Sequence, residues 1–202
     1  MSSSDRFHAA RAAFVEANAE DPNRVVVEGM ERPRQLVQAE RLASWVDRLD
    51  PGASESLRLA AWCQHIRRWE IPRSAYPAGR TGYLKWRKDL SRFHADTAEK
   101  ILARSGYDPE TIERVRAINL KRSLKTSHET QTIEDALCLS FLEHELAPFA
   151  EQHPADKVVE ILRKTWAKMS SRGHELALSL PMSPGMVRLV ERALAPPDAD
   201  EG

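Results

Sequence analysis

The sequence predicts an all-α fold, a single compact helical domain over residues 1–195. Glycine occurs only eight times among 202 residues, so few positions favour a break in a helix. Alternating runs of β-branched residues, which are typical of strands, are almost absent. The hydrophobic fraction is 42%, which is enough for a buried core in a chain of this length.

Prolines and glycines divide the chain into segments with helical periodicity. We expect helices at 5–20, 34–49, 54–69, 84–88, 90–105, 109–121, 130–150, 155–171 and 183–194. One candidate strand, residues 25–27, lies between Pro22 and Gly29 and is too isolated to build a sheet. The acidic, proline-containing segment 196–202 is expected to be a disordered tail.

Four of these helices carry a start signal. Ser54 and Asp108 are suitable N-caps, and Pro109 occupies the first position after the second of them. Asp156 can begin the helix at 155–171, and Ser183 with its following proline can begin the last one. These local signals predict where the helices begin without reference to the rest of the chain.

Charge and cysteine content exclude several classes of protein. Thirty basic and thirty acidic residues give a net charge of zero, which argues against a polybasic nucleic-acid coat. No apolar run is long enough for a transmembrane helix, and the first residues lack the pattern of a signal peptide. Cys63 and Cys138 are too few for a disulfide framework or a zinc knuckle. We therefore expect a cytoplasmic protein that does not contact a membrane.

The charges are nevertheless segregated along the chain. Residues 67–92 contain eight basic and two acidic residues, whereas residues 129–160 contain eight acidic residues and one lysine. Such asymmetry fits a basic face for an anionic ligand, and it also fits two segments that pack against each other. Both interpretations stay open.

A loop of about 13 residues is expected inside the basic segment, and a loop of this length in a compact domain is usually functional or disordered. Its aromatic residues argue against disorder. Guanidinium groups bind phosphate in a bidentate manner. The candidates for a phosphate cradle are therefore Arg67, Arg68, Arg73, Arg80, Lys85 and Arg87. The candidates for stacking on a ligand or closing over it are Tyr76, Tyr83 and Trp86.

Acidic and imidazole side chains lie on otherwise apolar helix faces at four places. These residues are Glu40, His65, His94 and Asp135. A buried charged group requires a partner, so their positions are informative. If the four faces converge, the side chains form a ligand set suited to manganese, iron, zinc or nickel. Each residue also has a structural interpretation: a lone histidine can be a hydrogen-bonded core residue, and Glu40 can pair with an arginine such as Arg68.

The order of these segments resembles that of the HD-domain metal-dependent phosphohydrolases. The resemblance rests on LAAWCQHIRRWEIPR, FHADTAEKILARSGYDPETIERVRAI and QTIEDALCLSFLE, over about residues 34–146. It places Gln64 and His65 where that superfamily has a His-Asp pair, His94 at the start of a later helix, and Asp135 at the final aspartate. Glu40 then occupies the place of the first histidine. Lys121 stands near a position where the superfamily often has another histidine. The resemblance therefore implies either a metal site with changed ligand types or a site without metal in which Lys121 supplies the positive charge.

The whole chain also resembles a family catalogued as domain of unknown function 4202. The resemblance rests on AERLASW, QHIRRWEIPR, GYLKWRKDLSRFHA, QTIEDALCLSFLE and RKTWAKMSSRGHE, which cover most of residues 34–176. It implies a compact helical protein and brings no established activity.

Other catalytic motifs find no support in the sequence. Residues 168–172 are similar to the KMSK signature of class I aminoacyl-tRNA synthetases, but that chemistry needs a parallel-sheet fold, and no βαβ unit is present. We interpret these residues as the end of a helix with Gly173 as its C-cap. A nucleophile elbow, a Walker loop and a dinucleotide fingerprint are all missing.

Two hypotheses about function follow. The first is a metal-dependent phosphohydrolase-like enzyme for a small phosphorylated or nucleotide substrate, with Glu134 or Glu143 orienting a water and Lys121 offsetting charge in the transition state. The alternative is a non-catalytic regulatory module that binds an anion, a nucleotide or RNA on a degenerate HD-like fold. Whether the protein is an enzyme, and in which oligomeric state it exists, the sequence leaves open.

Overall fold

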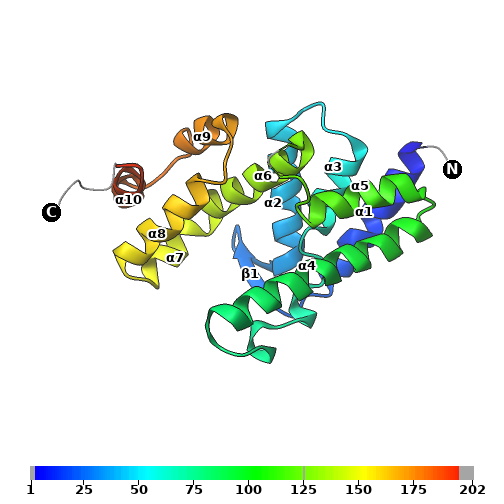
Figure 1. The fold of residues 1–202 in the computed structure, drawn as a ribbon, viewed down its shortest axis with the longest axis horizontal. Coiled ribbons are helices and arrows are strands. Elements are labelled where there is room, and N and C mark those ends of the chain that lie inside the picture. The colour runs from blue at the N-terminus through cyan, green and yellow to red at the C-terminus, as the bar shows by residue number, and fades with distance from the viewer. Residues whose placement is uncertain (1–2, 125, 196–202) are drawn as a thin grey trace. The chain divides into compact units, whose positions relative to one another are not determined.

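The computed structural model describes residues 3–124 and 126–195, which are mostly helical (Figure 1). The chain divides into two compact units, residues 1–133 and 134–202. The boundary falls inside helix α6 (His128–His144). The predicted helical class is confirmed. The HD-like helix order and the single domain stay predictions, and the expected tail at 196–202 lies outside the described residues.

The first unit is built around a short central helix. Its helices are α1 (Ser3–Ala19), α2 (Arg34–Leu49), α3 (Glu55–Cys63), α4 (Gly79–Arg104) and α5 (Pro109–Asn119), with 3₁₀ turns η1 (Arg68–Glu70) and η2 (Arg73–Ala75). Helix α3 packs against α1, α2, α4 and α5. Leu57, Leu59 and Ala60 in α3 are fully buried. Every residue of α3 except Glu55 and Arg58 is buried, as expected for a helix inside a core.

The predicted N-caps are confirmed at three helices. The side chain of Ser54 accepts a hydrogen bond from Leu57 N at 3.1 Å, and Asp108 accepts one from Thr111 N at 2.8 Å. Ser183 begins α10 (Pro184–Leu194) in the same way. These side chains satisfy backbone donors that have no partner within the helix. Asp156 does not cap its helix; it lies in the first turn, and Pro154 occupies the cap position.

A small hairpin corrects the prediction that residues 25–27 form no sheet. Strand β1 (Arg24–Val27) pairs antiparallel with β2 (Met30–Pro33). The two turn residues, Glu28 and Gly29, have φ of 52° and 80°, as a tight hairpin of twisted strands requires. The turn escaped prediction because glutamate rarely adopts the left-handed conformation.

Two predicted helices in the basic segment form one. Instead of separate helices at 84–88 and 90–105, α4 runs unbroken for 26 residues and begins at Gly79. At position 82 the helix passes very close to the backbone of Pro77. A Cβ atom would clash there, so this position requires glycine. His94 consequently lies inside a long helix and not at the start of one. The loop before α4, residues 64–78, is slightly longer than expected, because α3 ends early, and it contains η1 and η2.

Helix α3 is shorter than the predicted segment 54–69. It ends at Cys63, and Arg67 adopts the left-handed conformation with φ of 52°. Such a residue cannot continue a right-handed helix, so the chain turns away toward η1. Gln64 and His65 therefore lie at the turn where the chain leaves the core helix.

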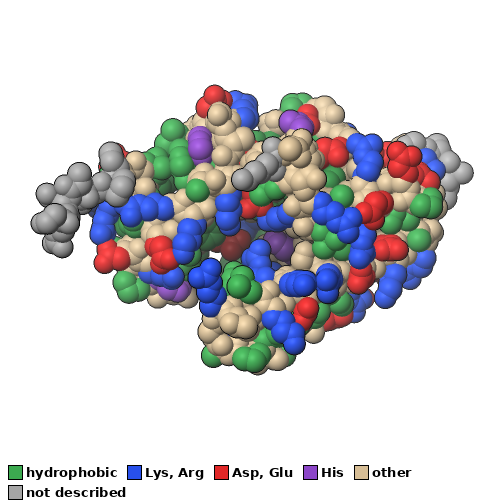
Figure 2. Space-filling view, viewed as in Figure 1, with side chains coloured by type: hydrophobic (Ala, Val, Ile, Leu, Met, Phe, Trp, Pro, Cys, Tyr) green, Lys and Arg blue, Asp and Glu red, His purple; other side chains and the backbone are tan. Residues whose placement is uncertain are grey.

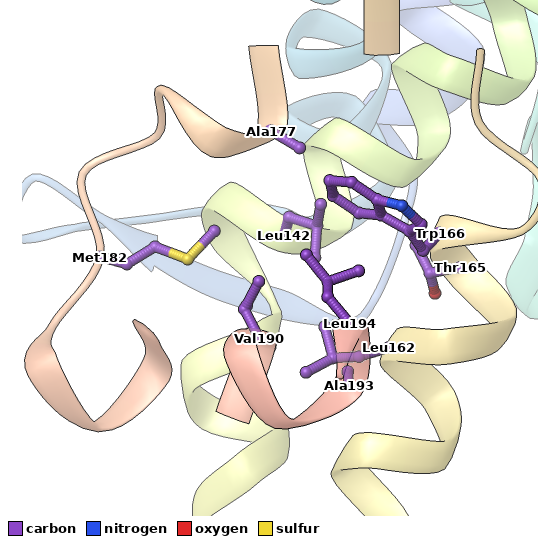
Figure 3. Close-up of a pocket in the computed structure, with 9 residues that line it drawn as sticks. All are labelled: Leu142, Leu162, Thr165, Trp166, Ala177, Met182, Val190, Ala193 and Leu194. Carbon is purple, nitrogen blue, oxygen red and sulfur yellow. The ribbon is translucent and has the colours of Figure 1, made fainter. Parts of the chain in front are cut away.

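The second unit contains the rest of α6 and four further helices. These are α7 (Leu146–Glu151), α8 (Ala155–Trp166), α9 (Ser171–Leu178) and α10. Figure 3 shows apolar side chains from these elements directed toward one another, with Leu142 from α6, Trp166 from α8 and Leu194 from α10. Helices α8 and α10 pack closely together. Their contact gives this unit an apolar core of its own.

Two predicted helices in the second unit are each divided. The segment 130–150 breaks before α7, where Pro148 has no N–H to bond to the carbonyl oxygen of His144. The segment 155–171 ends at Trp166, and Ser170 caps the new helix α9. Gly173 is therefore a residue of the first turn of α9, which corrects its prediction as a C-cap.

Among the described helices, none combines the length and the apolar character that crossing a bilayer requires.

Candidate functional site

A cavity of about 290 Å³ in the first unit brings together residues from four segments. It is lined by Gln64, His65, Arg68, Arg87, Lys88, Leu90, Ser91, His94, Asn119, Leu120 and Lys121. Four of these side chains are basic and none is acidic. Its volume is near the lower end of the roughly 300–1,000 Å³ typical of small-molecule sites.

His65 reaches the cavity from the turn that follows α3. On its other side it lines a very small cavity with room for about one water molecule, together with Asn18 and Gln35. Each of those two residues has a buried side-chain oxygen without a hydrogen-bond partner among the described residues. The His65 imidazole thus separates a small polar pocket from the basic cavity.

His94 is placed by α4 and is only 4% exposed. His94 lies on the buried face of α4, as predicted, because Ala98 and Ile101 on the next turns of that face are also buried. Its Nδ1 lies 2.7 Å from the carbonyl oxygen of Ile66, and its Nε2 is buried without a partner among the described residues. The ring centroids of His65 and His94 are 5.9 Å apart and meet edge to face.

Both imidazoles are kept neutral by their surroundings. The pKa of His94 is lowered to about 4, first by burial and then by repulsion from Arg68 and Arg87. The hydrogen bond to Ile66 raises this pKa, but by less than burial lowers it. Burial and the nearby charges of Arg68, His94, Lys121 and Arg87 lower the pKa of His65 well below its ordinary value. At neutral pH the cavity therefore joins two uncharged imidazoles to four cations.

The cations reach the cavity from three directions. Figure 2 shows Lys and Arg side chains gathered over the face that carries α4, which contributes Arg87 and Lys88. The guanidinium of Arg68 lies over the ring of Trp86, 4.9 Å from its centroid. Lys121 follows α5 in the left-handed conformation, with φ of 54°. Such a backbone is costly for a residue with a Cβ atom.

Of the residues predicted to bind a ligand, only Arg68 and Arg87 line this cavity. Arg67 pairs with Glu20 and Glu70, and Arg73 donates to backbone carbonyls of its own loop. These arginines fasten the loop that precedes α4.

The three predicted stacking residues also have roles within this segment. The hydroxyl of Tyr76 lies 3.2 Å from a carboxylate oxygen of Asp89, and buried Trp86 donates its Nε1 proton to Ile71 O. Tyr83 is 43% exposed and lies against Trp86. A stacking role for Tyr83 stays a prediction.

The four predicted metal ligands are not drawn together as one group. Glu40 pairs with Arg32 at 2.8 Å and lines a separate groove. Asp135 in the second unit accepts hydrogen bonds from the backbone N–H and the hydroxyl of Ser170. Within residues 3–124 and 126–195, no three His, Cys, Asp or Glu side chains form a group that could hold a metal ion.

The residues beside His65 and His94 do not fit a divalent cation, because they add arginine and lysine instead of a carboxylate. A resident metal therefore stays a prediction, and the charge of the cavity favours an anion.

The predicted catalytic residues lie in both units. Lys121 lines the basic cavity. In the second unit, Glu134 is buried with a carboxylate oxygen 3.9 Å from Lys168 Nζ, and Glu143 lies 3.1 Å from His144 Nε2. Their catalytic roles stay predictions.

Sequence reasoning missed three polar residues of the cavity, namely Lys88, Ser91 and Asn119. Lys88 and Ser91 precede His94 on α4 within two turns, and Ser91 lies four residues after Arg87 and three before His94, on the same side of the helix. That spacing is a usable signal once His94 is selected. Asn119 carries no such signal, because it meets the cavity only through the packing of α5 on α3.

Comparisons with known proteins add one finding. The family model described as "Domain of unknown function (DUF4202)" matches residues 8–190. No curated protein and no solved structure matches the chain.

Proposed function

We propose that this chain, which belongs to the DUF4202 family, binds a small phosphorylated ligand in the basic cavity beside His65 and His94. The observation that carries the proposal is the composition of the cavity: four basic side chains, two neutral imidazoles and no carboxylate. Arginine and lysine are the side chains that bind phosphate groups most often, and a concave site strengthens their effect. This is the binding function that the sequence suggested as an alternative to metal-dependent hydrolysis.

The states of the side chains support an anion over a cation. A metal cation in the cavity would be repelled by four positively charged side chains, those of Arg68, Arg87, Lys88 and Lys121. An anion would be attracted by the same charges, and no negative charge of a cavity side chain opposes it. The hydroxyl of Ser91 adds a donor that can bind a phosphate oxygen.

The test is a calorimetric titration of the full-length protein with inorganic phosphate at fixed ionic strength. Arg87→Ala removes a cation that lines the cavity. Arg92→Ala removes an exposed cation from the same helix that does not line it. We expect saturable binding that Arg87→Ala weakens by about tenfold, whereas Arg92→Ala changes it by less than about twofold.

Two results would overturn the proposal. One is the absence of saturable phosphate binding by the wild-type protein. The other is an equal loss of affinity in the two variants, because it would mean that the overall charge of the surface attracts phosphate and the cavity does not.

A further inference from the structure

The wall of the basic cavity carries buried hydrogen-bond acceptors as well as cations. His94 and Asn119 are 4% and 3% exposed, and both line the cavity. His94 Nε2 and Asn119 Oδ1 have no hydrogen-bond partner among the described residues. Buried polar atoms of this kind are rare in folded proteins, so each calls for an explanation.

The hydrogen bond of His94 makes its Nε2 an acceptor. A backbone carbonyl oxygen can only accept, so the proton shared with Ile66 belongs to Nδ1 of the imidazole. Because the ring is neutral near pH 7, Nε2 then carries a lone pair and no proton. Nε2 can therefore accept a hydrogen bond from a bound molecule.

The orientation of the Asn119 amide is set by the thiol of Cys63. That thiol donates to the carbonyl oxygen of Leu59 at 3.2 Å, and burial raises its pKa to about 12, so the sulfur keeps its proton. The sulfur accepts from Asn119 Nδ2, also at 3.2 Å. The opposite amide orientation would place Oδ1 against a sulfur whose proton is already donated, so Oδ1 is the group left without a partner.

A phosphate group alone would not complete this cavity. Its oxygens can accept from the arginines and lysines, but the dianion of a phosphate monoester has no proton to donate to Nε2 or Oδ1. A second part of the ligand has to provide donors. Hydroxyl groups next to the phosphate would do so, and the volume of about 290 Å³ suits a ligand smaller than a whole nucleotide.

We propose that the ligand is a small phosphate ester of a polyol or sugar, held by its phosphate on the basic side chains and by its hydroxyl protons on His94 Nε2 and Asn119 Oδ1. This inference rests on the proposed function, since it assumes that the cavity binds phosphate. It adds the chemical class of the ligand and the residues that select it.

The test compares two probes of similar size on the full-length protein. Glycerol 3-phosphate and n-propyl phosphate share a three-carbon chain and a phosphate, and they differ by two hydroxyl groups. We expect glycerol 3-phosphate to bind at least about tenfold more tightly, because each buried acceptor gains a hydrogen bond only from this probe. The dianion of n-propyl phosphate has no proton to donate, so this probe is the reference for the basic side chains alone, and inorganic phosphate tests the proposed function itself.

Two variants locate the discrimination. Asn119→Leu removes the amide acceptor, and His94→Phe removes Nε2 while keeping an aromatic ring. We expect each variant to lower the affinity for glycerol 3-phosphate more than the affinity for n-propyl phosphate, and so to reduce the ratio of the two affinities. Thermal unfolding identifies any variant that fails to fold, and the wild-type comparison of the two probes does not depend on either variant.

Three results would overturn the inference, and they differ from failure of the proposed function. Equal binding of the two probes, with phosphate still bound, rejects selection by hydroxyl groups and leaves phosphate binding in place. An undiminished preference in both folded variants shows that other residues read the hydroxyls. If none of the three probes binds, the proposed function fails and the inference fails with it.

Discussion

The imidazole of His94 donates its Nδ1 proton to the carbonyl oxygen of Ile66 across 2.7 Å, joining the middle of α4 to the turn that follows α3. These two residues are 28 positions apart in the sequence. Their contact fixes the tautomer of His94 and brings the ring to 5.9 Å from that of His65. The basic cavity is arranged around this hydrogen bond.

The stability of the protein is expected to fall in mild acid because of His94. Its pKa is about 4 in the folded protein, below the ordinary value of 6.5, owing first to burial and then to Arg68 and Arg87. Between these values the unfolded chain binds the proton and the folded chain does not, so stability is lost as the pH falls. From pH 7 to pH 5 the loss from His94 is about 2 kcal/mol.

Urea denaturation at the two pH values measures this loss. His65 changes in the same direction, since its pKa is also lowered. In the variant His94→Gln we expect a pH dependence smaller by roughly the 2 kcal/mol assigned to His94. An identical pH dependence in wild type and variant would show that His94 is not buried in its neutral form.

Replacement of Lys121 is expected to separate stability from binding. Its left-handed backbone costs about 1 kcal/mol for any residue with a Cβ atom, and glycine avoids that cost. Lys121→Gly should therefore be more stable toward urea than Lys121→Ala, by up to about 1 kcal/mol after the greater chain entropy of glycine is subtracted. Both variants should bind phosphate more weakly than wild type. A glycine variant less stable than the alanine variant would contradict the assigned backbone.

Asp135 and Gly173 are expected to be coupled in the second unit. A Cβ atom at Gly173 would lie 2.8 Å from Asp135 Oδ1, which also accepts from the backbone N–H of Ser170. Gly173→Ala should cost about 1–3 kcal/mol through overpacking. In the Asp135→Ala background the same change should cost nothing, because the clash is gone and alanine favours the helix. Additive effects in this double-mutant cycle would show that the two residues do not touch.

Metal content separates the two functions suggested by the sequence. Protein purified without chelators or a nickel column is expected to contain no stoichiometric manganese, iron, zinc or nickel by plasma mass spectrometry. The reason is that the cavity offers two imidazoles among cations, with no carboxylate beside them. One equivalent of metal that is lost in both His65→Ala and Asp135→Ala would instead support the metal-dependent phosphohydrolase.

Local signals in the sequence were sufficient for three of the helix starts, those capped by Ser54, Asp108 and Ser183. Ser54 and Asp108 cap their helices through bonds that span three residues, so no distant contact is needed to foresee them. The divisions at Pro148 and Ser170 also have local causes, but the surrounding apolar residues continue the helical pattern and hide them. The hairpin was missed because its turn uses Glu28 in a conformation that glutamate seldom adopts.

The candidate site was predictable only in part. His65 and His94 were found because each is a polar residue at helical spacing from apolar ones, a pattern that can be recognised within one segment of the sequence. Arg68 and Arg87 were among the arginines expected to bind phosphate, but Asn119 was not found, since it joins the cavity through the packing of α5 on α3. The same packing decides which charges meet the histidines, and for this reason the sequence left metal and anion equally open.

The most direct test of the account is a nuclear magnetic resonance titration that follows the histidine ring nitrogens. The full-length protein would be titrated with inorganic phosphate at constant ionic strength, with chloride as the control anion. We predict saturable shifts of the His65 and His94 signals with phosphate alone, a proton that stays on Nδ1 of His94, and about tenfold weaker binding in Arg87→Ala. Ring signals that do not move at saturating phosphate, or that move equally with chloride, would contradict phosphate binding in the basic cavity.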